Sequence, residues 1–287
     1  MSALANRDFV KMNGLGNEIV IVDMRRDPHP IVAAEARAAA RQEAYDQLMA
    51  LYPADSADAV IRIFNNDGSE VGACGNGMRC IAALVSRETG KAALQFETAA
   101  GLVRCWRAAD GLFTVDMGKP RLHWDEIPLA RPMPDTRAID LTFAPEGGPT
   151  LQSPSVVSMG NPHAIFWVEH PEAFDLRRIG SRLEHDPLFP ERANITLAAT
   201  PSRDRIVIRT WERGAGLTKA CGSAACAAAV AAARLDRTGR KVTVSLPGGD
   251  LTIDWRESDD HVLMTGPVEY ERSGSFDAAL LAGAGAA

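Results

Sequence analysis

Two cysteine–glycine pairs, Cys74-Gly75 and Cys221-Gly222, are the residues of this sequence whose types and context best suit chemistry. Each pair follows a strand-like run and precedes a helix-like stretch, so each thiol is expected at a helix N-terminus. The positive end of the helix dipole and the N–H groups of the first turn favour a thiolate there, which makes a cysteine usable as a base or nucleophile. Two such thiols indicate a reaction that acts on two faces of a substrate.

The two cysteines belong to an internal repeat, because they lie 147 positions apart and other landmarks keep nearly the same offset. The further pairs are Gln47 with Asn194, Asn65 with Glu212, 60–64 with 207–211, Gly16-Asn17 with Gly160-Asn161, Gly101 with Gly249, and Gly118 with Gly266. An offset held over this many positions predicts two copies of one structural unit. The length of 287 residues also suits two domains better than one.

Composition excludes several classes of protein. The chain is 46% hydrophobic with a net charge of −6 and has no cluster of lysine and arginine, which disfavours nucleic acid and anionic membranes as partners. The first 30 residues show no secretory signal, and the longest apolar stretch, 224–233, is shorter than the ~20 residues that span a bilayer. Five cysteines without a disulfide-framework spacing favour a reducing cytoplasm.

Hydrophobic patterning predicts the elements that carry the cysteines. A helix at about 76–89 has Met78, Ile81, Ala82 and Val85 on one face, with Gly90 closing it. A second helix, at about 223–235, is nearly all alanine and is expected to be central and buried. The remaining expected elements are a strand, turn and strand over 9–23, a helix from Pro30 to about Ala50, strands at 60–64, 94–97, 102–107 and 112–116, a proline-rich crossing between the halves at 119–154, and a frayed end after Tyr270.

The blocks around the cysteines resemble the signatures of the diaminopimelate epimerase family over about residues 9–268. The blocks that carry the resemblance are Asn65-Asn66-Asp67-Gly68-Ser69, Cys74-Gly75-Asn76-Gly77-Met78-Arg79, Gly160-Asn161-Pro162-His163, Glu212-Arg213-Gly214-Ala215-Gly216 and Ala220-Cys221-Gly222-Ser223. The resemblance implies epimerisation of LL-2,6-diaminopimelate to the meso isomer in lysine and peptidoglycan-precursor biosynthesis, without a cofactor or metal. It is compatible with a homodimer.

The resemblance also implies an α+β fold of two pseudo-symmetric domains, each a mostly antiparallel, barrel-like sheet wrapped around a central helix, with the active site in the cleft between them. The first domain would be 1–118 with Cys74, to which a C-terminal strand within 266–287 returns, and the second would be 119–265 with Cys221. Cys74 and Cys221 would be the catalytic pair, and His163 and Glu212 would adjust their protonation. The substrate-binding residues implied by the resemblance are Asn13, Gln47, Asn65, Gly75, Asn76, Asn161, Asn194, Glu212, Arg213, Gly222 and Ser223.

This chemistry agrees with the residues themselves. Inverting an α-carbon needs a base on one face and an acid on the other, and two thiols can exchange these roles. The weak carbon acid also needs donors aimed at the substrate carboxylate, and the N–H groups at Gly75-Asn76 and Gly222-Ser223 are suited to that task. Arg213 is the expected partner of the distal carboxylate, because a guanidinium grips a carboxylate with two hydrogen bonds.

Other interpretations remain open at this point. Cys80, Cys105 and Cys226 are best read as small buried hydrophobes. The cysteine spacings do not fit a structural zinc site, and a cysteine hydrolase would leave one Cys-Gly pair without a purpose. A proline or hydroxyproline racemase would use the same two-cysteine chemistry, and a non-catalytic binding protein gated by a reversible Cys74–Cys221 disulfide is a third hypothesis. The sequence does not say which cysteine is the thiolate at rest or how the halves close.

Overall fold

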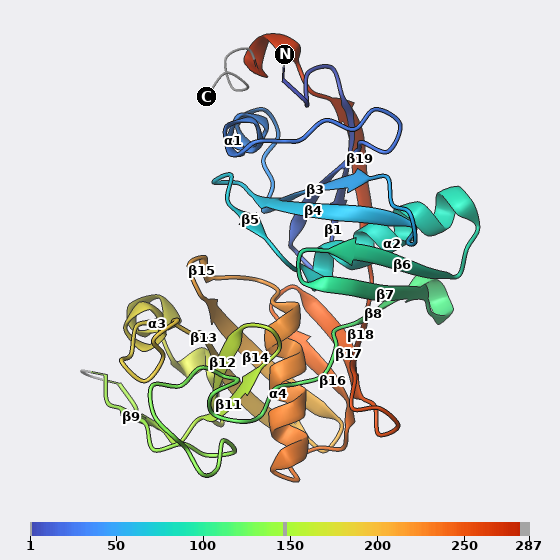
Figure 1. The fold of residues 1–287 in the computed structure, drawn as a ribbon. Coiled ribbons are helices and arrows are strands. Elements are labelled where there is room, and N and C mark those ends of the chain that lie inside the picture. Colours follow the sequence, from blue (N-terminus) through green and yellow to red (C-terminus); the bar gives the residue numbers. More distant parts are fainter. Residues whose placement is uncertain (1, 146–147, 282–287) are drawn as a thin grey trace. The chain divides into compact units, whose positions relative to one another are not determined.

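The computed structural model describes residues 2–145 and 148–281, which form two units (Figure 1). Unit 1 consists of Met1–Val115 and Gly266–Ala287, and unit 2 consists of Asp116–Thr265. The chain therefore leaves unit 1, completes unit 2 as a continuous segment, and comes back. None of the helices within the described ranges combines the length and apolarity of a membrane span.

The described elements of unit 1 are three α-helices, a 3₁₀ turn and a sheet that the C-terminal strand joins. In chain order they are β1 (Asp8–Asn13), β2 (Glu18–Asp23), α1 (Ala33–Gln42), β3 (Gln47–Tyr52), β4 (Ala59–Asn65), β5 (Glu70–Val71), α2 (Gly75–Thr89), β6 (Ala93–Thr98), β7 (Gly101–Arg107), the 3₁₀ turn η1 (Ala109–Gly111), β8 (Phe113–Asp116), β19 (Glu269–Ser275) and α5 (Ala278–Leu281).

The elements of unit 2 follow the same plan. They are β9 (Thr142–Phe143), β10 (Leu151–Gln152), β11 (Ser155–Ser158), β12 (Pro162–Trp167), the 3₁₀ turn η2 (Pro171–Ala173), α3 (Leu176–Glu184), β13 (Asn194–Ser202), β14 (Arg205–Glu212), β15 (Gly216–Leu217), α4 (Gly222–Arg234), β16 (Lys241–Leu246), β17 (Gly249–Trp255) and β18 (Val262–Gly266).

Strand pairing confirms that the fold is an internal duplication. In unit 1, β1–β2 is antiparallel, β2–β3 parallel, β3–β4 antiparallel, β4–β6 parallel and β6–β7 antiparallel. In unit 2, the pairs β11–β12, β12–β13, β13–β14, β14–β16 and β16–β17 repeat this order of senses. Gln47 opens β3 as Asn194 opens β13, and Asn65 ends β4 as Glu212 ends β14. The predicted α+β class of two related, mostly antiparallel sheets is thus correct.

Each sheet encloses a helix that begins at one of the cysteines. Helix α4 contacts β11, β12, β13, β14, β16 and β17, and its alanines from Ala224 to Ala232 are buried (Figure 1). Alanine suits this position because its small side chain lets strands approach the helix from several sides. Helix α2 contacts β1, β2, β6 and β7 and buries Met78, Ile81, Ala82 and Val85, as its spacing predicted. Gly90 ends α2 in a left-handed conformation with φ of 74°.

The predicted helix from Pro30 to Ala50 is wrong in its second half. Helix α1 ends at Gln42, and 47–52 form β3, which lies between β2 and β4. The segment Leu48 to Leu51 is fully buried, so burial on both faces of a central strand overrides the helix propensity of Leu-Met-Ala.

The segment 119–154, expected to cross between the halves, belongs to unit 2. Ile127, Leu129, Ile139 and Leu151 lie in the same apolar cluster as Phe166 of β12, and β9 pairs with β10. The described part of this proline-rich segment covers the core of unit 2.

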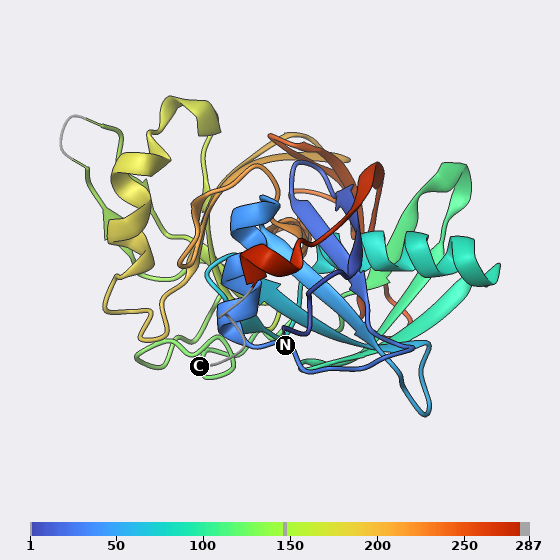
Figure 2. The same cartoon turned by 90° about the horizontal axis from the view of Figure 1, so that it is seen from above.

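The C-terminal strand β19 pairs antiparallel with β1, and α5 lies beside α1 (Figures 1 and 2). Phe276 is buried against Phe9, and Gln42 exchanges two hydrogen bonds with the backbone of Asp277. The frayed end expected after Tyr270 therefore does not begin there, and residues 282–287 lie outside the described residues.

The enclosed position of α4 gives a test of the fold. Replacing buried Ala228 by Leu should lower the free energy of unfolding by about 1–3 kcal/mol, because the added methylenes overpack the core. Chemical denaturation measures this change. The control is Ala233→Leu in the same helix at a half-buried position, which should cost clearly less. Equal effects of the two substitutions would show that α4 is not enclosed on the Ala228 side.

Candidate active site

Cys74 lies at the N-cap of α2, in the extended conformation that precedes a helix. Its Sγ accepts a hydrogen bond from the backbone N–H of Gly77 at 3.4 Å. A Cβ at position 77 would lie 2.2 Å from the Sδ of Met49 and 3.3 Å from the Cys74 sulfur, so glycine leaves room for both side chains where they are. The turn thus places a thiol beside the N–H groups that begin the helix.

Two side-chain amide oxygens face the Cys74 sulfur. Asn17 Oδ1 and Gln47 Oε1 each lie 3.7 Å from Sγ and can accept its proton as a hydrogen bond. Asp46 fixes this orientation, because its carboxylate accepts from Asn17 Nδ2 at 2.9 Å and so turns Oδ1 toward the sulfur. Asn17 Nδ2 also donates to Gln47 Oε1 at 2.9 Å. Gln47 in turn donates to Asn65 Oδ1 at 3.3 Å, which links three strand ends in one amide chain.

The structure brings Asn17, rather than Asn13, to the cysteine. Asn13 uses its Oδ1 to accept from the N–H of Gly16 at 2.6 Å and its Nδ2 to donate to Glu271 at 3.0 Å. It shapes the turn between β1 and β2, and its substrate role stays a prediction. The sequence held a signal for Asn17, because Gly16-Asn17 is the counterpart of Gly160-Asn161 in the repeat.

The other predicted residues of this turn are Gly75 and Asn76, the first two residues of α2. The Asn76 side chain is buried, and its Oδ1 accepts from Arg79 Nη1 at 3.0 Å. First-turn N–H groups of a helix lack an acceptor within the helix, so this end of α2 suits an anion.

Cys221 occupies the N-cap of α4 and is buried. Its Sγ lies 3.5 Å from Ser223 Oγ, which accepts from Asn161 Nδ2 at 3.3 Å. Asn161 Oδ1 is 2.9 Å from Nε2 of His163, so four polar side chains from β12, its preceding turn and α4 form one chain. Gly222 opens the helix directly after the thiol.

His163 is neutral near pH 7. Complete burial lowers its pKa to about 3, and the positive charge of Arg213 acts in the same direction. The carbonyl oxygen of Asn161 can only accept, so Nε2 carries the proton of the neutral ring. Nδ1 has no hydrogen-bond partner among the described residues. His163 therefore orients Asn161 as a neutral donor.

Glu212 is the acidic residue that acts on Cys221. Burial raises the pKa of the Cys221 thiol well above its usual value, and the Glu212 charge raises it further. Hydrogen bonds from Ser223 and from the N–H of Ala224 oppose this effect. Thr218 Oγ1 donates to Glu212 Oε1 at 2.5 Å and holds the carboxylate in place. Cys221 is consequently a thiol in this arrangement, which the sequence alone could not establish.

Asn194 and Arg213 meet where β13 begins and β14 ends. Asn194 Oδ1 accepts from the backbone N–H of Arg213 at 2.9 Å, and its Nδ2 donates to the carbonyl of Pro162 at 3.1 Å. The Arg213 guanidinium donates to the carbonyl of Glu191 at 2.9 Å. Asn194 thus fastens the β12 and β14 ends together, while Arg213 retains donors for a ligand.

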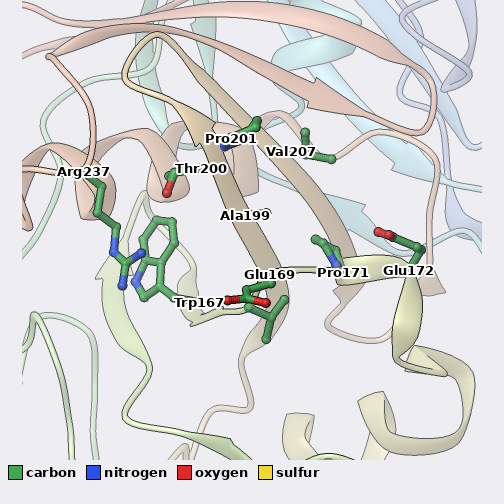
Figure 3. A pocket seen from close by; sticks show the side chains of 10 residues that line it. Trp167, Glu169, Pro171, Glu172, Ala199, Thr200, Pro201, Val207 and Arg237 are labelled. Atoms are coloured by element: carbon green, nitrogen blue, oxygen red, sulfur yellow. The ribbon is translucent and has the colours of Figure 1, made fainter.

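The groove shown in Figure 3 lies elsewhere on unit 2 and contains none of the predicted site residues. Its volume is about 540 Å³, and its lining residues are Trp167, Val168, Glu169, Pro171, Glu172, Ala199, Thr200, Pro201, Val207 and Arg237. Arg237 stacks over the Trp167 ring at 4.7 Å. The chemistry-bearing residues are those at the two helix N-termini, and the groove is separate from them.

Comparison with known proteins gives the family. The diaminopimelate epimerase family model matches residues 9–123 and 155–271. A diaminopimelate epimerase of Rhodopseudomonas palustris is 62% identical over 287 residues, covering 99% of this chain and 98% of the relative. The chain belongs to the diaminopimelate epimerase family.

A second relative is equally similar in sequence, and two solved structures share the fold. The Nitrobacter hamburgensis diaminopimelate epimerase is 62% identical over 98% of this chain and 99% of the relative. A predicted epimerase from Pseudomonas aeruginosa has the same fold, with a TM-score of 0.68 at 20% identity over 94% of this chain and 99% of that chain. A hydroxyproline epimerase from Agrobacterium vitis also shares the fold, with a TM-score of 0.68 at 16% identity over 96% and 93% of the two chains.

The effect of Glu212 on Cys221 can be tested by substitution. Glu212→Gln should lower the pKa of Cys221, because it removes the negative charge that disfavours the thiolate. At a fixed pH near 8, alkylation of Cys221 by iodoacetamide, followed by peptide mass spectrometry, should be faster by about 3-fold or more, since the rate follows the thiolate fraction. The control is Glu191→Gln, because Glu191 binds Arg213 only through its carbonyl. An unchanged Cys221 rate in Glu212→Gln would contradict the electrostatic coupling.

Neutral His163 predicts acid sensitivity of the fold. In the unfolded state the His163 side chain is protonated below about pH 6.5, whereas in the folded state it is protonated only below about pH 3. The free energy of unfolding therefore falls as the pH drops from 6.5 to 3. The contribution is about 1.4 kcal/mol per pH unit. Urea unfolding of the wild type between pH 7 and 4 should therefore show a steeper loss than His163→Gln, which cannot take up that proton. Replacing the exposed His123 by Gln should leave the wild-type slope in place.

Proposed function

We propose that this chain epimerises LL-2,6-diaminopimelate to meso-diaminopimelate without pyridoxal phosphate, as a step in lysine and peptidoglycan-precursor biosynthesis. The observation that carries the proposal is the pair of cysteines, one at the N-cap of the enclosed helix of each unit. Membership in the family supports it, because the relatives at 62% identity are named diaminopimelate epimerases.

The two cysteines act as base and acid on opposite faces of one α-carbon. One thiolate removes the α-proton, and the other thiol supplies a proton from the opposite side, which inverts the centre. The protonated state of Cys221 suits it to be the acid in the direction in which Cys74 is the base. In the reverse direction, the thiolate that Cys221 has become takes the proton and Cys74 returns one, so the pair needs no other proton source.

The negative charge that develops on the substrate carboxylate is stabilised by the two helix N-termini. The N–H groups of Gly75 and Asn76, and those of Gly222 and Ser223, are the donors for this task. Each well-placed donor of this kind contributes about 3–4 kcal/mol to the transition state. The glycine after each cysteine has no side chain, so the substrate carboxylate can come close to these backbone N–H groups.

The remaining residues recognise the two ends of the substrate. Arg213 binds the distal carboxylate, since a guanidinium offers two parallel donors. The amide groups of Asn65 and Asn161 bind the amino and carboxyl groups of the substrate. The carboxylate of Glu212 binds an amino group. Gln47 and Asn194 hold neighbouring site residues by hydrogen bonds to Asn65 and to the Arg213 backbone.

The proposal is tested by proton exchange. Purified protein incubated with LL-diaminopimelate in deuterated water should yield the meso isomer with deuterium at one α-carbon, measured by NMR and mass spectrometry. Cys74→Ala and Cys221→Ala should each lower the rate by at least about 10²-fold, because each removes an acid–base group. Cys226→Ala, which changes a buried cysteine within α4, is the matched control and should retain activity.

Full turnover by either catalytic-cysteine variant would contradict the two-base scheme. Exchange on proline or hydroxyproline, but not on diaminopimelate, would select the racemase alternative. If none of these substrates exchanges under reducing conditions, the remaining interpretation is a non-catalytic binding protein gated by its thiols.

A further inference from the structure

The two units carry a matching asparagine, but its amide is turned differently in each. Asn17 stands directly before β2 and Asn161 directly before β12, in the matching Gly-Asn pairs of the repeat. In unit 1 the amide oxygen Oδ1 faces the Cys74 sulfur at 3.7 Å. In unit 2 Oδ1 lies 2.9 Å from His163 Nε2, and Nδ2 donates to Ser223 Oγ at 3.3 Å. One residue type therefore offers an acceptor to one cysteine motif and a donor to the other.

An aspartate sets the orientation in unit 1. Asp46 stands directly before β3, which runs parallel to β2 with Gln47 opposite Ile19, so the starts of the two strands lie side by side. A carboxylate can only accept hydrogen bonds. The Asp46 carboxylate accepts from Asn17 Nδ2 and from the backbone N–H of Glu18, both at 2.9 Å. It therefore binds the NH2 end of the amide and leaves the oxygen for the sulfur.

Unit 2 has a different residue in each of these places. The repeat places Ala193 at the position of Asp46, and it places His163 at the position of Ile19. Alanine offers no side-chain acceptor, whereas the neutral His163 ring donates from Nε2 to Asn161 Oδ1. The amide of Asn161 is thus held by its oxygen. The difference in amide orientation between the units follows from these neighbouring residues.

The Asn17 amide is fixed from two sides. Its Nδ2 carries two hydrogens and has two acceptors at 2.9 Å, the Asp46 carboxylate and Gln47 Oε1. A turned amide would bring its oxygen against both of these oxygens. Gln47 is oriented in the same way, because its Nε2 donates to Asn65 Oδ1 at 3.3 Å. The Oε1 of Gln47 consequently also lies 3.7 Å from the Cys74 sulfur.

These oxygens and the helix N-terminus favour opposite protonation states of Cys74. A carbonyl oxygen can accept a hydrogen bond from the S–H group, but it repels a thiolate. The backbone N–H of Gly77, 3.4 Å from the sulfur, favours the thiolate. Cys74 is only half-buried, so desolvation opposes the thiolate less than at the buried Cys221. The oriented oxygen of Asn17 provides an additional preference for the thiol.

The other titratable groups around Cys74 form a background that the variants below leave unchanged. Asp46 itself is exposed, so water and salt screen its charge. Burial raises the pKa of Cys80 to about 12, which keeps this neighbour neutral. The remaining titratable side chains of α2 and of the strands packed against it are Asp8, Lys11, Glu18, Asp23, Arg79, Arg87, Glu88, Glu97, Arg104, Cys105 and Arg107.

We propose that Asn17 is a further catalytic residue of the Cys74 half, whose Oδ1 is the acceptor that stabilises the proton on the Cys74 sulfur. Asp46 is its positioning residue, because it acts on the sulfur through the orientation of Asn17. The meaning for epimerisation rests on the proposed function: when Cys74 takes the α-proton as base, the S–H bond that forms has an acceptor already in place. Asn17 thus favours the thiol at Cys74, as burial and Glu212 do at Cys221.

The pH dependence of Cys74 alkylation tests the proposal without any substrate. Iodoacetamide labelling of the reduced full chain, followed by peptide mass spectrometry, gives a rate at each pH. The midpoint of this profile reports the protonation of the thiol, and its plateau at high pH reports access of the reagent. Asn17→Ala removes the acceptor, so the midpoint should move to lower pH and the rate below it should rise by about 3-fold relative to the plateau. An unchanged midpoint, with or without a changed plateau, would overturn the proposal.

Two substitutions at Asp46 separate orientation from charge. Asp46→Ala removes the acceptor of Asn17 Nδ2 and frees the amide to turn, so the midpoint should fall as in Asn17→Ala. Asp46→Asn removes the same charge but keeps an oxygen that can accept from Asn17 and from the Glu18 N–H, so it should keep the wild-type midpoint. Equal shifts in the two variants would overturn the positioning role. The pair also keeps the proposal falsifiable if thermal unfolding shows that Asn17→Ala does not fold.

Two controls accompany these variants. Asn66→Ala changes an exposed asparagine in the turn after β4 and should keep the wild-type midpoint. Cys221 is labelled in the same samples, and its rate should not respond to Asn17→Ala, because Ser223 and Glu212, which act on it, belong to unit 2. Alkylation needs no turnover. Absence of deuterium exchange with diaminopimelate would therefore contradict the proposed function without deciding the role of Asn17 at the sulfur.

Discussion

The structure depends on placing a reactive thiol at the N-terminus of a helix that a sheet encloses. Burial makes an ionised sulfur costly at Cys221, and Cys74 is half-buried, while each helix terminus supplies N–H groups that favour negative charge. The proposed two-base mechanism requires each sulfur both to lose and to regain a proton, and neither effect alone would suit both steps. Both effects act on the sulfur atom because of how each helix is packed. Strands surround α2 and α4, alanine lets them approach α4 closely, and a glycine follows each cysteine.

Duplication provides this arrangement twice but with different surroundings. At Cys74 the amide oxygens of Asn17 and Gln47 lie 3.7 Å from the sulfur, and Asp46 orients the amide of Asn17. At Cys221 a serine hydroxyl and a glutamate carboxylate take these places, and the carboxylate adds to the larger effect of burial in raising the pKa of the thiol. Asn65 and Glu212 occupy the same place in the repeat, so one strand-end position accounts for much of this difference. The two repeats thus share one fold but surround their cysteines with chemically different side chains.

The sequence predicted the duplication, both cysteine helices and the end of α2, because each depends on local periodicity, capping or a fixed offset. It misplaced the end of α1, because Gln47-Leu48-Met49-Ala50 has helical propensity and becomes a strand only through burial between β2 and β4. It also could not rank Asn13 against Asn17. Both flank the same tight turn, and only the Asp46 hydrogen bond, which is set by the meeting of β2 and β3, turns Asn17 toward the sulfur. The protonation of Cys221 was beyond the sequence because burial determines it.

The pairing of β19 with β1 has a consequence for how the molecule is made. Unit 2 is one uninterrupted stretch, so a ribosome releases all of it before the final strand of unit 1 exists. Until Glu269–Ser275 has been synthesised, the edge of β1 that later pairs with β19 has no strand to bind its backbone N–H and C=O groups. The interior unit can therefore mature first during synthesis, and the half that carries Cys74 is completed last, by residues translated almost two hundred codons after it.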